Sequence, residues 1–274
     1  MELRDLTTLD DFRAVVALEH EVWAFAAGDD AVPLAILAVT VRRGGILIGA
    51  FDAGRMVGFV YSLAGLKDGR PTQWSHMLGV ADSHRSAGLG RLLKLEQRRR
   101  ALAMGLDLIE WTYDPLQAAN AHLNFHRLGV VVEEYEENIY GESTSPLHGR
   151  MPTDRFVAEW WIRRPHVERR LEGTGPLVRS AEVADAPLVN RTRPAGRWLA
   201  PDGADLTRTD RRLLVEIPVG FTGMLAAEPD LARAWRMAAR GIFRHYFAAG
   251  YRAVDFLLDR PQGRGAYLLA RKDA

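Results

Sequence analysis

The sequence predicts an α/β protein with a mixed sheet, in which a large domain precedes a smaller one. Strand and helix patterns alternate through residues 73–128, and antiparallel patterns flank this stretch at 46–63 and 130–162. Residues 163–176 are charged and then rich in glycine and proline, which is typical of a domain boundary. We therefore expect domains at residues 1–163 and 177–274.

The elements of the larger domain follow from periodicity and from turn residues. Apolar side chains recur at helical spacing over 9–25, Pro33 suits the first turn of a helix over 33–42, and Gly105 ends a helix over 89–104. Residues 65–71 are predicted as a turn and 141–154 as a long loop. The expected strands cover residues 1–6, 46–52, 56–63, 73–80, 108–112, 130–140 and 155–162, with a further helix over 118–128.

The smaller domain is predicted to contain a strand, a long helix and two strands. These elements cover residues 212–219, 229–249, 253–258 and 266–271. The order strand, helix, strand matches the middle of the larger domain, so we interpret the smaller one as a degenerate half repeat. Its connecting loop, 220–228, lacks the glycine pattern described below, and we expect it not to bind the same ligand.

Composition excludes several classes of function. The chain of 274 residues has 36 basic and 35 acidic residues, so net charge gives no reason to expect nucleic-acid or membrane binding. It has no cysteine, which excludes disulfides, thiolate metal sites and an acyl-cysteine intermediate. The eight histidines form no tight ligand pattern, so no metal is expected. The N-terminus lacks a signal-peptide core, and we expect a cytoplasmic protein.

A glycine turn between a strand and a helix carries the strongest chemical signal. It reads Arg85-Ser86-Ala87-Gly88-Leu89-Gly90. Unpaired N–H groups at a helix N-terminus attract anions, and glycines let a phosphate approach the backbone closely. Arg85 could add a charge-assisted hydrogen bond. The same residues also fit a tight turn with no ligand.

The surrounding sequence resembles the acetyl-CoA-binding core of the GNAT N-acetyltransferase superfamily. The stretch QWSHMLGVADSHRSAGLG, followed by RLLKLEQRRRALAMG, contains that family's Q/R-x-x-G-x-G/A motif at Arg85, Gly88 and Gly90. Downstream, LDLIEWTYDPL is similar to the family's fifth strand and NAHLNFHRLGV to its next helix. The chain looks closest to longer bacterial members with a C-terminal extension. The resemblance implies a GNAT fold over residues 1–163, with the smaller domain as a half-GNAT-like addition.

The resemblance implies a binding site for acetyl-CoA or another acyl-CoA. Main-chain groups of the strand before the turn would pair with pantetheine, and an N–H there, that of Leu78, would stabilise the oxyanion. Arg91, Lys94 and Arg98 could reach the ribose phosphate, or form a solvated basic helix face. The expected coenzyme-binding residues are Met77, Leu78, Gly79, Val80, Arg85, Ser86, Ala87, Gly88, Leu89, Gly90, Arg91, Asn120 and Asn124.

Acyl transfer to an amine needs a general base, and three residues are candidates. His76 lies on the strand that would face the thioester, where some family members carry a histidine in this role. Glu110 lies on a buried strand, where a carboxylate either pairs or does chemistry. Glu216 lies on the corresponding strand of the smaller domain. The family's usual acid, a tyrosine, is replaced by Phe125, so either His126, Tyr113 or water substitutes, or the thiolate leaves without a dedicated acid.

The sequence indicates less about the residues that bind the acyl acceptor than about those that bind the coenzyme. Trp23, Trp74 and Trp111 could line a pocket for a hydrophobic amine, or belong to the core. We expect an N-acyltransferase, with acetyl transfer favoured, that acts on a small-molecule amine by direct attack in a ternary complex. The alternatives are a succinyl-CoA-dependent amino-acid N-succinyltransferase and a non-catalytic acyl-CoA-sensing module. A homodimer is common in the family and is expected on that ground.

Overall fold

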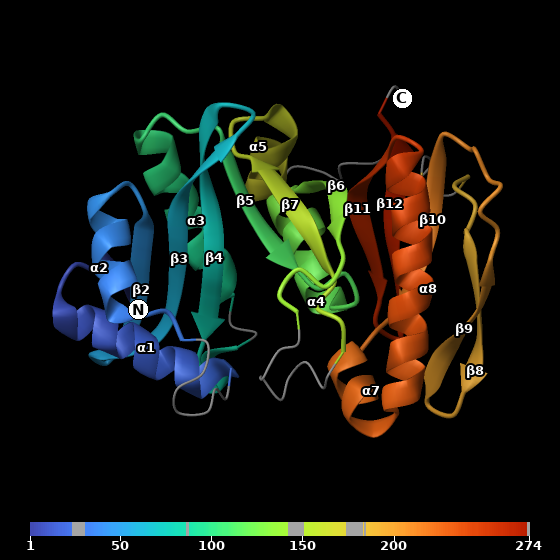
Figure 1. Cartoon of the computed structure of the whole chain (residues 1–274), viewed down its shortest axis with the longest axis horizontal. Coiled ribbons are helices and arrows are strands. Elements are labelled where there is room, and N and C mark those ends of the chain that lie inside the picture. The colour runs from blue at the N-terminus through green and yellow to red at the C-terminus, as the bar shows by residue number, and fades with distance from the viewer. Residues whose placement is uncertain (24–30, 86–87, 142–150, 174–182, 184, 273–274) are drawn as a thin grey trace. The chain divides into compact units, whose positions relative to one another are not determined.

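The computed structural model describes residues 1–23, 31–85, 88–141, 151–173, 183 and 185–272 (Figure 1). Contacts divide the chain into two compact units. Of the described residues, unit 1 comprises those within 1–111 and 161–163, and unit 2 comprises those within 112–141, 151–160 and 164–272. This division falls near residue 111 because Val132 pairs with Ala253, which joins residues 112–160 to the C-terminal strands. The domain limits 1–163 and 177–274 stay a prediction.

Unit 1 is a mixed sheet with helices on both faces. The strands lie in the order β1-β2-β3-β4-β5, and all neighbours are antiparallel except β4 and β5, which are parallel. Helices α1 and α2 cover one face and α3 covers the other (Figure 1). The elements are β1 (Glu2–Asp5), α1 (Leu9–Trp23), α2 (Leu34–Arg42), β2 (Ile46–Asp52), β3 (Arg55–Lys67), β4 (Arg70–Val80), η1 (Asp82–His84), α3 (Leu89–Ala103) and β5 (Leu108–Tyr113).

Unit 2 contains an antiparallel sheet in the order β7-β6-β11-β12-β10 and a separate hairpin of β8 and β9. Helix α8 packs against one face of the sheet, where Phe243 lies 5.3 Å from the Tyr267 ring. The elements are α4 (Ala118–Ala121), the π-helical η2 (His122–Leu128), β6 (Val131–Glu136), β7 (Arg155–Trp161), α5 (Pro165–Glu172), β8 (Asn190–Ala195), β9 (Trp198–Ala204), β10 (Arg212–Pro218), α7 (Phe221–Ala227), α8 (Pro229–Ala248), β11 (Tyr251–Asp259) and β12 (Arg264–Arg271).

The structure confirms the mixed α/β class and corrects several local predictions. The turn expected over 65–71 is much shorter, because β3 continues to Lys67 and the chain reverses at Asp68 and Gly69, both with positive φ. The segment 163–176, predicted as a boundary, contains helix α5. That helix has Pro165 in its first turn, a buried Val167 and the left-handed Gly173 at its end. The predicted chain order of strand, helix and strand is present as β10, the helices α7 and α8, and β11. Within the sheet, β12 lies between β10 and β11.

No helix in the described part of the chain is long and apolar enough to cross a membrane.

Candidate functional site

The candidate site is centred on β4, whose pairing with β3 is broken by a bulge at His76. Tyr61 pairs with Met77 and Ser62 pairs with Ser75, so His76 is the extra residue that opposes no residue of β3. A bulge re-aims the side chains on its strand and is often found beside active sites. The sequence pattern showed a continuous strand and could not show this irregularity.

The bulge places the His76 imidazole beside an aromatic group of the face that α1 and α2 cover. Its ring lies edge-to-face with the Tyr61 ring at 6.1 Å, and the Tyr61 hydroxyl is 2.8 Å from that of Thr40. The residue is exposed, although neighbouring protein atoms partly desolvate its ring. This desolvation lowers the pKa of His76 below its ordinary value of 6.5. His76 is therefore neutral near pH 7 and can accept a proton.

Trp23, expected to line the acceptor pocket, reaches this same part of β4. Its ring packs edge-to-face on Phe59 at 6.1 Å. A Cβ built at Gly79 would lie 2.8 Å from Phe59 and 3.2 Å from Trp23, so both rings press on the β4 backbone there. Trp23, Tyr61 and His76 thus share one face of the unit 1 sheet.

Beyond Trp74 the edge of β4 that faces β5 has no strand partner in the described chain. The parallel pairing joins Gln73 to Ile109 and Trp74 to Glu110, and it ends there although β4 runs on to Val80. In an antiparallel pair, alternate residues turn their N–H and C=O groups away from the partner strand. Part of the main chain between Ser75 and Val80 is therefore directed away from β3, on the side where β5 has left the strand. This stretch holds the predicted pantetheine-binding residues Met77, Leu78, Gly79 and Val80.

The glycine turn connects this edge to the N-terminus of α3. Gly88 precedes the helix with φ of 83°, a left-handed conformation that favours glycine, and it offers no side-chain cap. N–H groups of the first turn, including those of Leu89 and Gly90, are thus left for water or a ligand. A Cβ at Gly90 would meet only Leu78, at 3.6 Å. Ser86 and Ala87 lie outside the described residues.

Two of the basic residues expected near the phosphates have partners within unit 1. Arg85 donates from Nε to the Val80 carbonyl at 3.3 Å and pairs with Asp82 at 2.8 Å, so it ties the turn to the end of β4. Arg98 donates to the Ile162 carbonyl from two nitrogens, at 2.9 and 2.7 Å. Arg91 is half-buried in the first turn of α3.

The expectation that Lys94 reaches the ribose phosphate is wrong. Lys94 is 4% exposed because it faces the sheet, where it donates to Ser75 at 2.8 Å and to Gln97 at 3.2 Å. Its Nζ lies 3.7 Å from the centre of a Trp111 ring. Burial lowers the pKa of Lys94 well below its ordinary value. Trp111, proposed for the acceptor pocket, is buried in this contact, whereas Trp74 is half-buried on β4.

The two glutamates predicted as alternative bases are held by cations. Glu110 is buried on β5 beside Trp74 and accepts from Lys67 at 3.1 Å. Glu216, on β10 of unit 2, accepts from Arg264 at 2.7 Å and from Thr192 at 3.1 Å. Each carboxylate is already engaged by a cation of its own unit, so the geometry favours His76 over both.

The remaining predicted residues belong to unit 2. Asn120 is exposed on α4, and Asn124 is buried in η2. Phe125, in the position of the family's acid, is fully buried and packs on Tyr267 with ring centres 5.6 Å apart. Tyr113 is buried with its hydroxyl 3.5 Å from that of Tyr267, and burial raises its pKa. A buried Tyr113 is therefore a poor proton donor to a ligand.

Sequence analysis missed Glu19, a fully buried carboxyl on α1. Its Oε2 accepts from the Val32 N–H at 2.9 Å, while Oε1 is buried without a partner among the described residues. Burial raises the pKa of Glu19 to about 7. The available signal was its position on the apolar stripe of the helix, where Phe12 and Val15 are also buried.

Replacing Glu19 by glutamine is expected to stabilise the protein at alkaline pH. The folded-state pKa, about 7, lies above the ordinary value of 4.5, so the carboxyl's contribution is full below pH 4.5 and is lost as pH rises through 7. Relative to Glu19→Gln, the native protein should lose about 3 kcal/mol of unfolding free energy across that window. Urea unfolding at pH 4.5 and 8 measures it. Glu21→Gln, at the exposed Arg55 pair, is the control, and equal pH profiles for both variants would contradict the expectation.

In the described part of the chain, no group of three or more histidine, aspartate or glutamate side chains is placed to hold a metal ion.

Comparison with known proteins finds similarity among solved structures alone. No family model matches the chain, and no curated protein does. A putative acetyltransferase, yncA of Salmonella typhimurium, solved with acetyl-CoA, is 21% identical over 60% of this chain and 95% of its own, with a TM-score of 0.49. The ribosomal-protein-S18-alanine N-acetyltransferase of Escherichia coli is 17% identical over 59% and 93%, with a TM-score of 0.47. Aminoglycoside 6'-acetyltransferase type Ii is 17% identical over 60% and 100%, also with 0.47.

Proposed function

We propose that the chain is an acyl-CoA-dependent N-acyltransferase, with His76 as general base. The observation that carries this proposal is the continuity of three features along the chain. The edge of β4 without a strand partner leads to a glycine turn, the turn opens α3, and the bulge at His76 lies on the same strand. An extended ligand that ends in phosphates matches the first two features, and a reacting group beside β4 matches the third.

The residues at the turn fit the pyrophosphate of coenzyme A. A helix N-terminus attracts negative charge through its unpaired N–H groups and dipole. Gly90 has no side chain, and Leu78 at 3.6 Å is the one described neighbour of the position that a Cβ would take, so the first turn of α3 is open there. Along β4, main-chain groups between Met77 and Val80 would bind pantetheine, and one N–H would stabilise the oxyanion.

The proposed reaction requires the protein to accept a proton and to position the amine and the thioester. An amine nitrogen attacks the thioester carbon, the new C–N bond forms, the C–S bond breaks, and the amine's proton passes to His76. The low pKa of His76 keeps the imidazole neutral and able to accept this proton near pH 7. Because Phe125 has no hydroxyl, we propose that the thiolate leaves to solvent or takes its proton from water.

We propose a small-molecule amine as acceptor, because one aromatic ring contacts the proposed base and a second lies on the same face of the sheet. Tyr61 contacts the His76 ring, and Trp23 presses on the β4 backbone at Gly79. An aromatic wall favours an acceptor with an apolar body. Acetyl transfer is the proposed reaction; succinyl transfer to an amino acid and assembly as a homodimer stay predictions.

The direct test is thiol release from acetyl-CoA and succinyl-CoA against panels of amines and amino acids. Turnover with an amine supports the proposal and identifies both donor and acceptor. Coenzyme binding without turnover by any acceptor would indicate a sensing module. Absence of coenzyme binding in calorimetry would overturn the proposed function.

Gly90→Glu is expected to weaken coenzyme A binding about 100-fold or more while the protein stays folded. A carboxylate in the first turn of α3 favours the helix but repels a pyrophosphate at the same N–H groups. Gly90→Gln is the matched control, since it adds nearly the same volume without charge. Titration calorimetry with coenzyme A should show a much larger loss for glutamate than for glutamine. Equal affinities for the two variants would place the phosphates elsewhere.

A further inference from the structure

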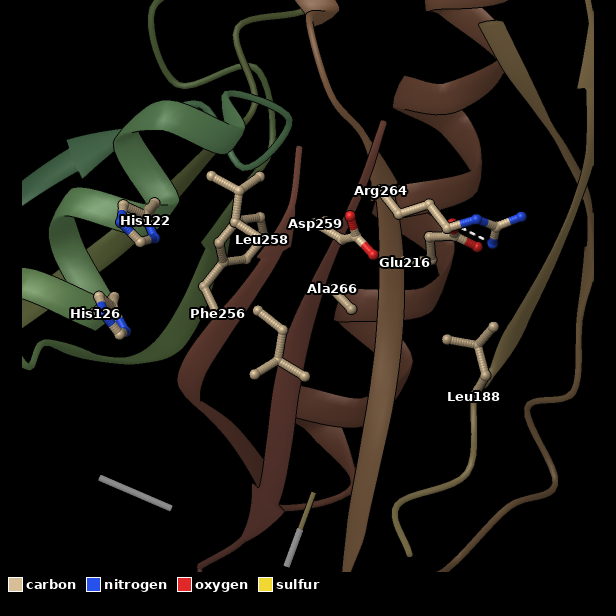
Figure 2. A pocket seen from close by; sticks show the side chains of 11 residues that line it. His122, His126, Leu188, Glu216, Phe256, Leu258, Asp259, Arg264 and Ala266 are labelled. Atoms are coloured by element: carbon tan, nitrogen blue, oxygen red, sulfur yellow. Dashed lines mark hydrogen bonds and ion pairs between the residues drawn. The ribbon is translucent and has the colours of Figure 1, made fainter. Parts of the chain in front are cut away.

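The residues expected to protonate the departing sulfur are poor proton donors. Phe125 has no hydroxyl, and Tyr113 is buried with a raised pKa. His126 stacks on His122 with ring centres 4.7 Å apart, beside a pocket of about 550 Å³ in unit 2 (Figure 2). Burial lowers the pKa of His126, so its ring is neutral near pH 7 and is a weak proton donor. These three residues therefore leave the negative charge on sulfur without a partner.

Lys94 contacts both strands at the point where β4 and β5 separate. The last parallel pair joins Trp74 to Glu110, so Ser75 and Trp111 are the next residues of the two strands. The Lys94 Nζ atom lies 2.8 Å from Ser75 Oγ and 3.7 Å from the centre of a Trp111 ring. All of these residues belong to unit 1. The amine of Lys94 thus reaches the first position at which β4 has lost its partner β5.

The Ser75 hydroxyl has both acceptor positions occupied and its proton left over. It accepts from Lys94 Nζ at 2.8 Å and from Gln97 Nε2 at 3.0 Å, and a serine hydroxyl has two acceptor positions and one O–H. Lys94 also donates to Gln97 Oε1 at 3.2 Å, which turns the amide nitrogen of Gln97 toward Ser75. No described residue accepts the Ser75 O–H, although the residue is only 4% exposed. Buried donors are normally satisfied, so this one indicates an acceptor from a ligand or water.

The charge of Lys94 makes this hydroxyl a stronger donor. Ser75 Oγ, Gln97 Oε1 and the face of the Trp111 ring are three acceptors for three N–H groups. They favour the ammonium form, although burial lowers the pKa of Lys94. Within the described ranges no carboxylate pairs with this cation. A buried ammonium without an anion destabilises the folded state, and a negative charge near Ser75 would offset that destabilisation.

Ser75 lies where the proposed function places the reacting thioester. It is the neighbour of His76, the proposed base, but it faces α3, whereas His76 faces Tyr61 on the other side of the sheet. The phosphates are proposed to bind at the N-terminus of α3, so the coenzyme arm reaches β4 from the α3 side. An amine that loses its proton to His76 then attacks from one face of the sheet, and the sulfur lies on the face of Ser75.

We propose that Ser75 is a catalytic residue that donates its O–H to the coenzyme sulfur, and that Lys94 and Gln97 hold and polarise this hydroxyl. The assignment rests on the proposed acyl transfer. As the amine nitrogen bonds to the acyl carbon, the C–S bond breaks and its electron pair stays on sulfur. The amine's proton passes to His76, and the thiolate keeps the Ser75 hydrogen bond until it takes a proton from water. Ser75 keeps its own proton throughout, and Lys94 acts through it as a positioning residue.

Coenzyme A and desulfo-coenzyme A, which lacks the sulfur, test the proposal on the full chain without an acceptor. An ordinary thiol ionises at about pH 8.5, and a hydrogen bond to a charged group is stronger than one to a neutral group. Between pH 6.5 and 8.5, titration calorimetry should therefore show the affinity for coenzyme A rising about 5-fold or more relative to desulfo-coenzyme A. A constant ratio in the wild type would overturn the proposal, whereas failure of both compounds to bind would contradict the proposed function itself.

Ser75→Ala should keep the affinity for desulfo-coenzyme A and abolish the rise with pH. Ser62→Ala is the matched control, because Ser62 is the buried serine opposite Ser75 on β3 and already donates to Gln73 at 2.7 Å. This control should retain the rise. A Ser75→Ala protein that also retained it would refute the assignment of Ser75 to the sulfur.

Lys94→Met nearly keeps the length of the side chain and removes its charge. It should flatten the rise with pH, while its midpoint in urea unfolding should be no lower than that of the wild type, since a buried cation without an anion is removed. A lysine with a structural role alone would give a lower midpoint and an unchanged rise. A retained rise would overturn the role of Lys94 whatever the midpoint. If either variant fails to fold, the ratio measured on the wild type still decides the proposal.

Discussion

Replacing His76 by alanine is expected to lower kcat for acyl transfer about 100-fold, the usual loss when a general base is removed. Coenzyme A affinity should be unchanged, since the imidazole contacts Tyr61 and the proposed phosphate turn lies beyond the end of β4 at Val80. His245→Ala, which removes a histidine at the surface of α8, is the matched control. Steady-state thiol release measures both variants.

The pH profile provides an independent check on the same residue. Protonated His76 cannot accept a proton, so kcat/KM should fall on the acid side at a pH below 6.5, in keeping with the lowered pKa. The His76→Ala variant should lose this acid limb. An unchanged rate in the variant would transfer the role of base to Glu110 or Glu216.

Asp255→Ala is expected to cost 3–5 kcal/mol of unfolding free energy, about the usual loss on breaking a buried ion pair. The side chains of Arg170 and Asp255 are 4% and 6% exposed and lie 2.6 Å apart. Removing the carboxylate leaves a buried guanidinium, whose Nε already has no partner in the described chain. It also removes the acceptor of the Phe256 N–H at 2.9 Å.

The matched control is Asp107→Ala, which breaks an ion pair with Arg163 at the surface of unit 1. These two side chains are 64% and 53% exposed, so the loss should stay within about 1 kcal/mol. Urea denaturation of both variants compares them. Replacing both members of the buried pair, as Arg170→Met with Asp255→Leu, should recover much of the loss. Similar losses for Asp255→Ala and Asp107→Ala would show that burial does not determine the unfolding free energy lost when the ion pair is broken.

Elements with strong local signals were predictable from the sequence. Apolar periodicity and the glycines at 88 and 105 located α3 to within a residue, and short apolar runs located β2 and β5. The hairpin of β8 and β9 was missed because Pro194 and Pro201 argue against strands. A separate two-stranded sheet tolerates proline, since each strand has an edge without a partner.

The candidate site was predictable where a motif occupies consecutive residues. It was less predictable where packing between elements determines the position of a side chain. The turn and His76 could be proposed from the sequence, yet the bulge could not, because it depends on the pairing of β4 with β3. Lys94 shows the same limit: helical spacing groups it with Arg91, but the orientation of α3 turns it into the core against Trp111. The raised pKa of Glu19 could not be predicted either, because it depends on the packing around α1.

The bulge at His76 also sets the register between the proposed base and the glycine turn before α3. Side chains alternate along a strand, so one extra residue exchanges the faces of everything that follows it. Deleting His76 would restore regular pairing with β3 and slide the turn before α3 by one position relative to Ser75, which bonds Lys94. The position of the proposed base and the position of the proposed phosphate turn therefore depend on each other. A homologue that lost the insertion would have to compensate at the turn, so covariation between positions 76 and 85–90 is the expected evolutionary trace of this geometry.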